Sequence, residues 1–335
     1  MVAGRRPENA AMLAPENAQH VGARAHQEDA FAFSDLADAK FVAHGGAMCV
    51  VCDGMGGLAA GAAASRAAVS AFLGRYVSKP PNETIPVALR ESLTAANEAV
   101  LALSAIEGDC GSTLAAVVVS GNTMHWVSVG DTRILLLRDG RLFRVNREHR
   151  YQVELRRECA HGDGIAPFPP DDDPRGDQLT SSLGEAPPGA IDISVRGLRW
   201  HPGDSVFVVS DGLYRTLDHG ALGELARESG PEICTAWVQA AIAAQRPDQD
   251  NVTAIGLRDR RAVPVGRADA LLHAAGRIGA RVQAVIASLR RQPSIATVTV
   301  IAILLVVMLL VASKASQAAA VESAERPGAQ PGFAR

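Results

Sequence analysis

Three apolar stretches of this 335-residue chain each end in an aspartate beside glycine, and they are residues 48–53, 126–131 and 206–211. Short apolar runs bounded by turn residues predict buried strands, and glycine permits a tight turn where each strand ends. Asp29 and Asp250 border two further strand-like segments. A single aspartate of this kind is most often a turn cap. Several that converge would repel one another, and divalent cations would relieve that repulsion.

The middle of the chain predicts antiparallel pairing. Strands are expected at 114–120, 123–129, 134–137 and 142–145, with turn signals at Gly121-Asn122 and Asp139-Gly140. Consecutive hairpins favour an antiparallel sheet over parallel βαβ units, so we predict an α+β fold. The remaining expected strands are 20–23, 31–33, 191–198, 205–210 and 251–257, and the expected helices are 58–77, 83–106, 151–158, 222–227 and 232–245.

Six short blocks, taken in order, resemble the bacterial type of the metal-dependent type 2C serine/threonine protein phosphatase family. They are Arg24 to Asp29, Asp53 to Gly57, Gly111 to Thr113, Val129 to Arg133, Ser210 to Leu213 and Asp250 to Thr253. Each block alone has little weight, but their order and number make the resemblance specific. It implies two central antiparallel β-sheets flanked by helices, an α/β/β/α sandwich.

The resemblance also implies a reaction, the hydrolysis of phosphoserine and phosphothreonine by water activated between two divalent metals. No protein nucleophile is then required. Oxygen ligands favour Mn²⁺ or Mg²⁺ over zinc. By resemblance, Asp53 bridges both metals, the Gly54 carbonyl binds one of them, and Asp211 and Asp250 hold the other.

The resemblance implies supporting roles for further residues. Glu28 and Asp29 would position metal-bound water, and Asp131 with Asp211 would hold a third, weaker metal. Arg24 would bind the phosphate, for which a guanidinium fork is geometrically suited. An ordinary surface ion pair is the alternative for Arg24.

The chain departs from the family pattern at three places. Gln27 replaces a frequent asparagine, and Met55 stands where eukaryotic relatives have a histidine, so that water would protonate the leaving group. Residues 146–150 read Asn-Arg-Glu-His-Arg in place of Thr-x-Asp-His-Ser. This last change motivates an alternative function, a catalytically silent phosphoprotein-binding module. A hydrolase of small phosphoesters is a third hypothesis, although no phosphate-binding P-loop is present.

The composition narrows the function classes. A formal charge of -3 gives no general case for nucleic-acid binding. Five cysteines without secretory spacing suit a reducing compartment. Cys49 and Cys52 form a C-x-x-C pattern, but residues three apart on a strand point to opposite faces, so we expect buried packing rather than a zinc or redox site.

The domain organisation follows from these patterns. We predict a flexible leader at 1–18, a catalytic domain at 19–260, a juxtamembrane linker or amphipathic helix at 261–293, a transmembrane helix at 294–312 and a polar tail at 313–335. The acidic, proline-rich stretch 162–177 predicts a loop. The family has a variable flap near this point, and a loop without a role is the alternative.

Residues 294–312 contain no charged side chain. At the helical rise they span about 28 Å, close to the roughly 30 Å core of a bilayer. Arg277, Arg281, Arg290 and Arg291 precede this span, whereas Lys314 follows it. This bias predicts a single-pass protein of the cytoplasmic membrane with its catalytic domain in the cytoplasm. By resemblance, its partners would be phosphorylated proteins, including a serine/threonine kinase and its targets.

Overall fold

The computed structural model describes residues 13–56, 59–161 and 175–260. They belong to a compact unit, Met1–Arg261. The expected juxtamembrane segment, transmembrane helix and tail lie outside the described residues, as does most of the expected loop at 162–177. Within the described ranges, no helix combines the length and the apolar character that a bilayer crossing requires.

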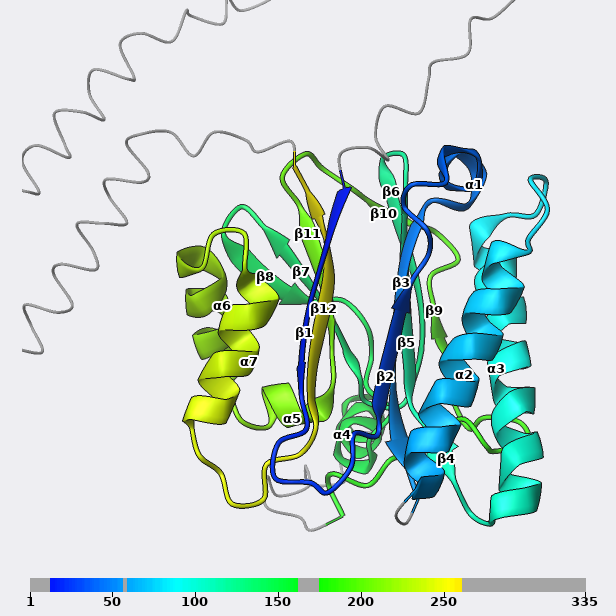
Figure 1. The fold of residues 1–335 in the computed structure, drawn as a ribbon, viewed down its shortest axis with the longest axis vertical. Helices are drawn as coiled ribbons and strands as arrows, with labels where there is room; N and C mark the ends of the chain where they lie inside the picture. Colours follow the sequence, from blue (N-terminus) through cyan, green and yellow to red (C-terminus); the bar gives the residue numbers. More distant parts are fainter. Residues whose placement is uncertain (1–12, 57–58, 162–174, 261–335) are drawn as a thin grey trace, which may run out of the picture. The chain divides into compact units, whose positions relative to one another are not determined.

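Two antiparallel sheets form the centre of the unit (Figure 1). The first has the strand order β1-β12-β11-β7-β8, and the second has the order β10-β6-β5-β3-β2, with β4 paired to β3 and β9 paired to β6. The strands of the first sheet are β1 Leu13–His20, β7 Arg133–Arg138, β8 Arg141–Arg144, β11 Ser205–Val209 and β12 Val252–Asp259. Those of the second are β2 Asp29–Phe33, β3 Ala47–Met55, β4 Gly111–Ser112, β5 Leu114–Ser120, β6 Thr123–Val129, β9 Asp192–Ile193 and β10 Leu198–Arg199.

A core of apolar side chains joins the two sheets face to face. Val51 and Val117 of the second sheet lie in the same cluster as Ile134, Val206 and Ile255 of the first. Alternate residues of a strand point to opposite faces, so the same strands also contribute to the outer layers. Each sheet is therefore buried on both faces, which explains why β3, β5 and β11 are apolar almost throughout.

Helices cover the outer face of each sheet (Figure 1). On the second sheet lie α2 Ala59–Val77 and α3 Ile85–Glu107, whose apolar side chains share a cluster with β3 and β5. On the first lie α5 Asp211–Tyr214, α6 His219–Glu228 and α7 Ile233–Ala243, and the Trp237 ring packs 4.8 Å from the Phe207 ring. The two further helices are α1 Ala39–Gly45 and α4 Tyr151–His161. This arrangement confirms the predicted α+β sandwich.

The two cysteines of the C-x-x-C pattern do lie on opposite faces of β3. Cys52 packs beneath the helices and Cys49 packs between the sheets. Both side chains are fully buried. Burial raises the pKa of the Cys49 thiol to about 12, so this thiol stays protonated and packs as a small apolar group.

One boundary prediction was wrong. We expected a flexible leader through residue 18 and a strand at 20–23, but β1 begins at Leu13 and pairs with β12 along its whole length. Pro15 and Glu16 lowered the strand signal of this segment. Because β1 is an edge strand with a single partner, Pro15 is tolerated there.

Three further features differ from the sequence-based expectation. The helices α1 and α5 were not predicted, since each spans about two turns or fewer and such short apolar runs carry little periodicity. The strand expected at 191–198 is two separate two-residue strands, β9 and β10, which both pair with β6.

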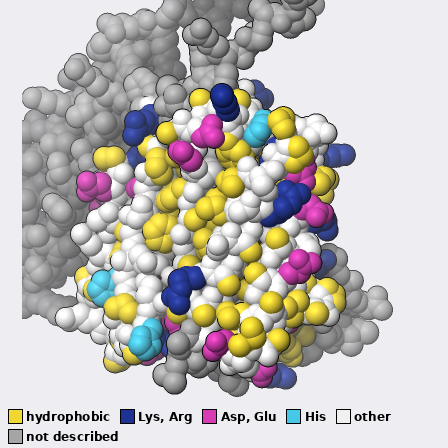
Figure 2. Space-filling view, turned by 45° about the vertical axis from the view of Figure 1, so that its right-hand side comes forward, with side chains coloured by type: hydrophobic (Ala, Val, Ile, Leu, Met, Phe, Trp, Pro, Cys, Tyr) yellow, Lys and Arg dark blue, Asp and Glu magenta, His cyan; other side chains and the backbone are white. Residues whose placement is uncertain are grey.

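Figure 2 turns the α2 and α3 side of the molecule toward the viewer. On the part of this face that the described residues form, hydrophobic side chains gather in several groups, and charged side chains are scattered among them. The exposed apolar side chains include Val77 and Val87. Exposed apolar side chains of this number are common on protein surfaces.

Candidate metal centre

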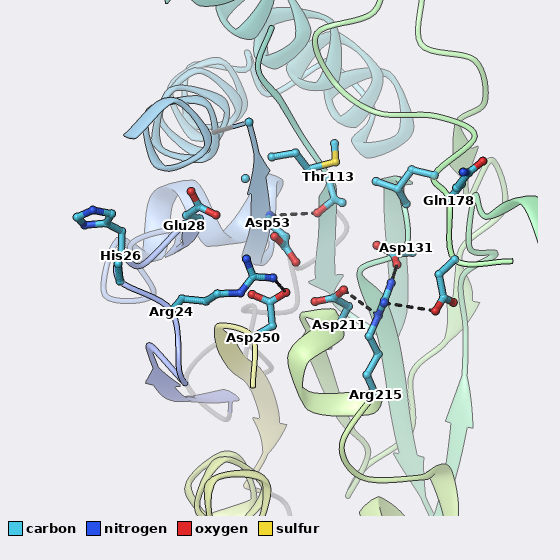
Figure 3. A pocket seen from close by; sticks show the side chains of 16 residues that line it. Arg24, His26, Glu28, Asp53, Thr113, Asp131, Gln178, Asp211, Arg215 and Asp250 are labelled. Carbon is cyan, nitrogen blue, oxygen red and sulfur yellow. Dashed lines mark hydrogen bonds and ion pairs between the residues drawn. The ribbon is translucent and has the colours of Figure 1, made fainter. Parts of the chain in front are cut away.

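The aspartates predicted at the strand ends border one pocket (Figure 3). In this view the carboxylates of Asp53, Asp211 and Asp250 point toward the same space. The described residues that line the pocket are Arg24, Ala25, His26, Glu28, Asp53, Gly54, Met55, Gly56, Thr113, Asp131, Asp177, Gln178, Leu179, Asp211, Arg215 and Asp250. Of the predicted site residues, only Asp29 lies outside this lining.

Asp53 is held by its backbone, which leaves its carboxylate available. Its amide donates to Thr113 Oγ1 at 3.0 Å, and its carbonyl accepts from the Thr113 amide at 2.8 Å and from Ser112 Oγ at 3.0 Å. Thr113 Oγ1 also lies 2.6 Å from Thr132 Oγ1. The Gly111-Ser112-Thr113 block therefore fixes the end of β3 from which Asp53 projects.

Gly54 lies at a close approach of α2 to β3. A Cβ atom at this position would lie 2.0 Å from the carbonyl oxygen of Gly61 on α2. The Gly54 amide donates to the Glu28 carbonyl at 3.1 Å, which ties β3 to the loop before β2. Only glycine permits this close approach of helix and strand beside the pocket.

Asp29 is a buried neighbour of the pocket. It pairs with Asp53 across β2 and β3, and its Oδ2 accepts from Ser210 Oγ at 2.8 Å and from Thr253 Oγ1 at 2.6 Å. Its Oδ1 is buried with no hydrogen-bond partner. Burial, together with the neighbouring charges of Asp211 and Asp250, raises the pKa of Asp29 to about 7.

Asp250 and Asn251 connect the start of β12 to the loop that carries Arg24 and Glu28. Arg24 donates to Asp250 Oδ2 at 2.7 Å. Asn251 Oδ1 accepts from the Glu28 amide at 2.6 Å, and Asn251 Nδ2 donates to the carbonyls of Val21 and His26. Arg24 therefore forms the ion pair that we had weighed as its alternative role, but it does so at the pocket rim with a predicted metal ligand.

Arg215 is a pocket residue that the sequence patterns did not single out. Its Nε lies 2.9 Å from Asp211 Oδ2 and one of its terminal nitrogens lies 3.7 Å from Asp131 Oδ2. Tyr214 donates its hydroxyl to the same Asp131 Oδ2 at 2.8 Å. An arginine four residues after an aspartate on a helix is common, so its spacing carried no distinctive signal.

The electrostatics of the pocket favour bound cations. Burial raises the pKa of Asp53 well above its usual value, and the charges of Asp29, Asp211 and Asp131 raise it further. Burial, with the charge of Asp131, raises the pKa of Asp211 to about 6, although Arg215 opposes this shift. The buried Asp211 Oδ1 has no hydrogen-bond partner. Clustered carboxylates with unused oxygens fit hard divalent cations.

The side chains do not form a closed metal cage as they stand. Among the described residues, no three acidic, histidine or cysteine side chains are grouped closely enough to hold a metal ion. The guanidinium groups of Arg24 and Arg215 instead neutralise Asp250 and Asp211. The donors are of the kind that hard divalent cations prefer, and those of Asp53, Asp211 and Asp250 face the same space.

The altered segment 146–150 is well packed. Asn146 is buried, accepts from the Ile134 amide at 2.7 Å and donates to Ser128 Oγ at 3.0 Å. Glu148 is fully buried and is bound by arginines 133, 144 and 150. His149 Nδ1 accepts from the Gly130 amide at 3.1 Å. The departure from the family pattern is therefore accommodated by hydrogen bonds and ion pairs at Asn146 and Glu148, although the buried Arg147 Nε and His149 Nε2 have no hydrogen-bond partner.

Comparisons with known proteins agree with this geometry. The family model described as protein phosphatase 2C matches residues 17–245, which is more than half of the chain. The serine/threonine protein phosphatase PstP of Mycobacterium tuberculosis is 33% identical over 114 residues, which are 33% of this chain and 22% of that protein. The chain thus matches less than a quarter of the length of this relative.

Two solved structures extend the likeness over most of the described residues. PppA, a regulatory component of T6SS in Pseudomonas aeruginosa, is 29% identical with a TM-score of 0.58, covering 73% of this chain and 97% of that one. The PstP catalytic domain in complex with two manganese ions is 25% identical with a TM-score of 0.56, again covering 73% and 97% of the two chains. From its family match, its two-sheet fold and its acidic pocket, this chain belongs to the protein phosphatase 2C family.

Proposed function

We propose that the chain is a metal-dependent protein phosphatase that hydrolyses phosphoserine and phosphothreonine. The observation that carries this proposal is the convergence of Asp53, Asp211 and Asp250, from three separate strand ends, on one pocket whose rim carries Arg24. Carboxylates with raised pKa values and unused oxygens are the expected donor set for Mn²⁺ or Mg²⁺. The PstP structure with two manganese ions supports the choice of metal.

Asp53, the Gly54 carbonyl, Asp211 and Asp250 would hold the metal ions. Two bound divalent cations would lower the pKa of water and neutralise the charge that grows on the phosphoryl oxygens. Asp29 and Glu28 would position metal-bound water beside these ligands, since Asp29 lies beside Asp53 in the sheet and Glu28 lines the pocket.

Arg24 would orient the phosphate group. Its side chain is 53% exposed and, among the described residues, its ion pair is to Asp250 at the pocket rim, so it can exchange a carboxylate for a phosphate oxygen without leaving the pocket. Asn251 fixes the loop on which Arg24 lies. Met55 has no acidic proton to give, so water would protonate the leaving serine or threonine oxygen.

The test compares the wild type with Asp53→Asn, using a phosphothreonine peptide and a small aryl phosphate. We expect Mn²⁺-dependent release of phosphate from both substrates, and loss of at least about 100-fold in kcat for Asp53→Asn, because the substitution removes a charge from the metal ligand set. Glu98→Gln, an exposed acidic residue on α3, is the matched control and should retain wild-type activity.

Two other functions give different results in this experiment. A silent phosphoprotein-binding module would bind the phosphopeptide and release no phosphate. A hydrolase of small phosphoesters would turn over the aryl phosphate but not the peptide. The altered segment at 146–150 motivates the silent module, and the hydrogen bonds and ion pairs of Asn146 and Glu148 weigh against it.

We also propose that residues 294–312 anchor the protein in the cytoplasmic membrane with its catalytic domain in the cytoplasm. The support is the uncharged run in the sequence and the arginines that precede it. Phosphorylated proteins in the cytoplasm, including a kinase and its targets, would then be the substrates. Release of the full chain from membranes by alkaline carbonate, without detergent, would contradict the anchor.

A further inference from the structure

Arg215 spans the two carboxylates at one end of the pocket. Its Nε lies 2.9 Å from Asp211 Oδ2 and a terminal nitrogen lies 3.7 Å from Asp131 Oδ2. A third carboxylate, that of Asp177, lies 3.4 Å from its other terminal nitrogen. Figure 3 shows the guanidinium of Arg215, the residue directly after α5, reaching between the carboxylates of Asp131 and Asp211. With three acidic partners, its planar fork has little freedom to leave this position.

One carboxylate oxygen of Asp131 is occupied without a metal. It is 4% exposed, and its Oδ2 accepts from the Tyr214 hydroxyl at 2.8 Å in addition to its contact with Arg215. Tyr214 is itself fixed, because the Arg133 guanidinium stacks 3.5 Å from the centre of its ring. A divalent cation at Asp131 Oδ2 would have to displace both the hydroxyl and the guanidinium.

Asp211 differs from Asp131 in this respect. Arg215 binds its Oδ2, whereas its buried Oδ1 has no hydrogen-bond partner. Arg215 therefore leaves one oxygen of Asp211 available and fixes the orientation of the carboxylate by holding the other.

The formal charges of the pocket residues agree with this difference between Asp131 and Asp211. Its described lining includes six carboxylates, those of Glu28, Asp53, Asp131, Asp177, Asp211 and Asp250, and two guanidinium groups, those of Arg24 and Arg215. The resulting four negative charges equal the charge of two divalent cations. A third divalent cation would leave two positive charges in excess, and withdrawal of Arg215 would reduce that excess to one.

We propose that Arg215 is a positioning residue that serves as a built-in cation at the Asp131 and Asp211 end of the pocket. The pocket of the wild type then binds two divalent cations, and Asp131 is not a metal ligand while Arg215 is present. This inference rests on the proposed metal-dependent function and replaces the third metal that the family resemblance implied. Its consequence is that removing Arg215 creates a metal site instead of destroying one.

The test measures bound Mn²⁺ per chain by equilibrium dialysis of the full chain in detergent, without substrate. We expect two ions for the wild type and a third, weaker ion for Arg215→Ala. Arg215→Lys, which keeps the charge, should remain at two. Arg227→Ala is the matched control, since Arg227 is an exposed arginine outside the pocket whose contact is the Gly140 carbonyl.

Substitution of Asp131 supplies a second arm, and its measurement in the wild-type background does not depend on the folding of Arg215→Ala. In the wild-type background, Asp131→Asn should leave the count of Mn²⁺ unchanged. In the Arg215→Ala background it should abolish the additional ion. Circular dichroism and a thermal melt verify that each variant is folded.

Two outcomes would overturn the inference while leaving the proposed function intact. In the first, the wild type binds three Mn²⁺ ions and Asp131→Asn binds one fewer. In the second, the wild type and a folded Arg215→Ala bind the same number of Mn²⁺ ions with the same dissociation constants. A wild type that binds no Mn²⁺ would overturn the inference and the proposed function together.

Discussion

At the scale of single residues, Gly54 makes the strongest steric demand in the site. An added Cβ would lie 2.0 Å from the Gly61 carbonyl, and backbone cannot give way as a flexible side chain does. We expect Gly54→Ala to lower the free energy of unfolding by about 1–3 kcal/mol, as overpacking does, and to weaken Mn²⁺ binding because β3 and α2 move apart beside Asp53. Urea unfolding and equilibrium dialysis measure the two effects.

Gly74 on the same α2 helix provides the matched control. A Cβ there meets nothing within 4 Å. Gly74→Ala should therefore stabilise the protein by roughly 0.5–1 kcal/mol, because alanine is the better helix former, and it should leave Mn²⁺ binding unchanged. Similar destabilisation by both substitutions would contradict the steric argument for Gly54.

The same scale shows what the sequence could predict of the site. Asp53, Asp211 and Asp250 were identifiable because each follows or precedes an apolar strand, and strand ends can meet at one edge of a sandwich. Arg215 and Tyr214 were not, since their importance depends on Asp131, which lies 83 residues from Tyr214 along the chain. Local spacing does not encode a contact of that kind.

At the scale of elements, one buried carboxylate joins two strands and the start of a helix. Glu148 is fully buried and binds Arg133 of β7, Arg144 of β8 and Arg150, which directly precedes α4. Burial alone would raise its pKa, but the three guanidinium groups outweigh burial and lower it. The ionised carboxylate is therefore the form that the folded protein prefers.

We expect Glu148→Gln to lower the free energy of unfolding by about 3–5 kcal/mol near neutral pH, because three arginines lose their buried partner. A lowered folded pKa contributes stability above the unfolded pKa of about 4.3, and this contribution is lost as the pH falls below that value. The difference between the variant and the wild type should narrow in acid. Urea unfolding at neutral and acid pH measures it, with the exposed Glu91→Gln as control. A difference that persists unchanged in acid would contradict the ionic origin.

The elements themselves were predicted where pattern and burial agree. The strands β5 and β6 match their predicted ranges, since β5 is a nearly continuous apolar run, β6 mixes apolar residues with polar ones, and turn residues separate the two. The edge strand β1 was missed because its stability comes from pairing with β12 rather than from its own composition. Pairing with a distant strand is a tertiary effect that overrides local propensity.

At the scale of the whole molecule, the fold places like charges together and depends on their neutralisation. The antiparallel hairpins in the sequence indicated the fold class, but not how the two sheets pack against each other. The core between the sheets sets that packing, and with it the distances between the carboxylates at the ends of β3, β11 and β12. That core concentrates Asp29, Asp53 and Asp211 in a buried region. Without bound cations, repulsion between these carboxylates therefore destabilises the folded protein.

This repulsion predicts a pH-dependent response to metal removal. Burial, and then neighbouring carboxylates, raise the pKa of Asp29 to about 7 and that of Asp211 to about 6. A raised folded pKa gives stability that is complete below the unfolded pKa of about 3.9 and is lost as the pH rises through the folded pKa. In chelator, these groups should therefore lower Tm as the pH rises from about 5 to about 8.

Mn²⁺ neutralises the same carboxylates, so its stabilising shift in Tm should be larger at the higher pH, where the metal also competes with fewer protons. Differential scanning fluorimetry measures both trends, and Asp211→Asn should flatten them because it removes one of the titrating charges. A shift in Tm that is equal at both pH values would mean that the carboxylates are not the groups that the metal relieves.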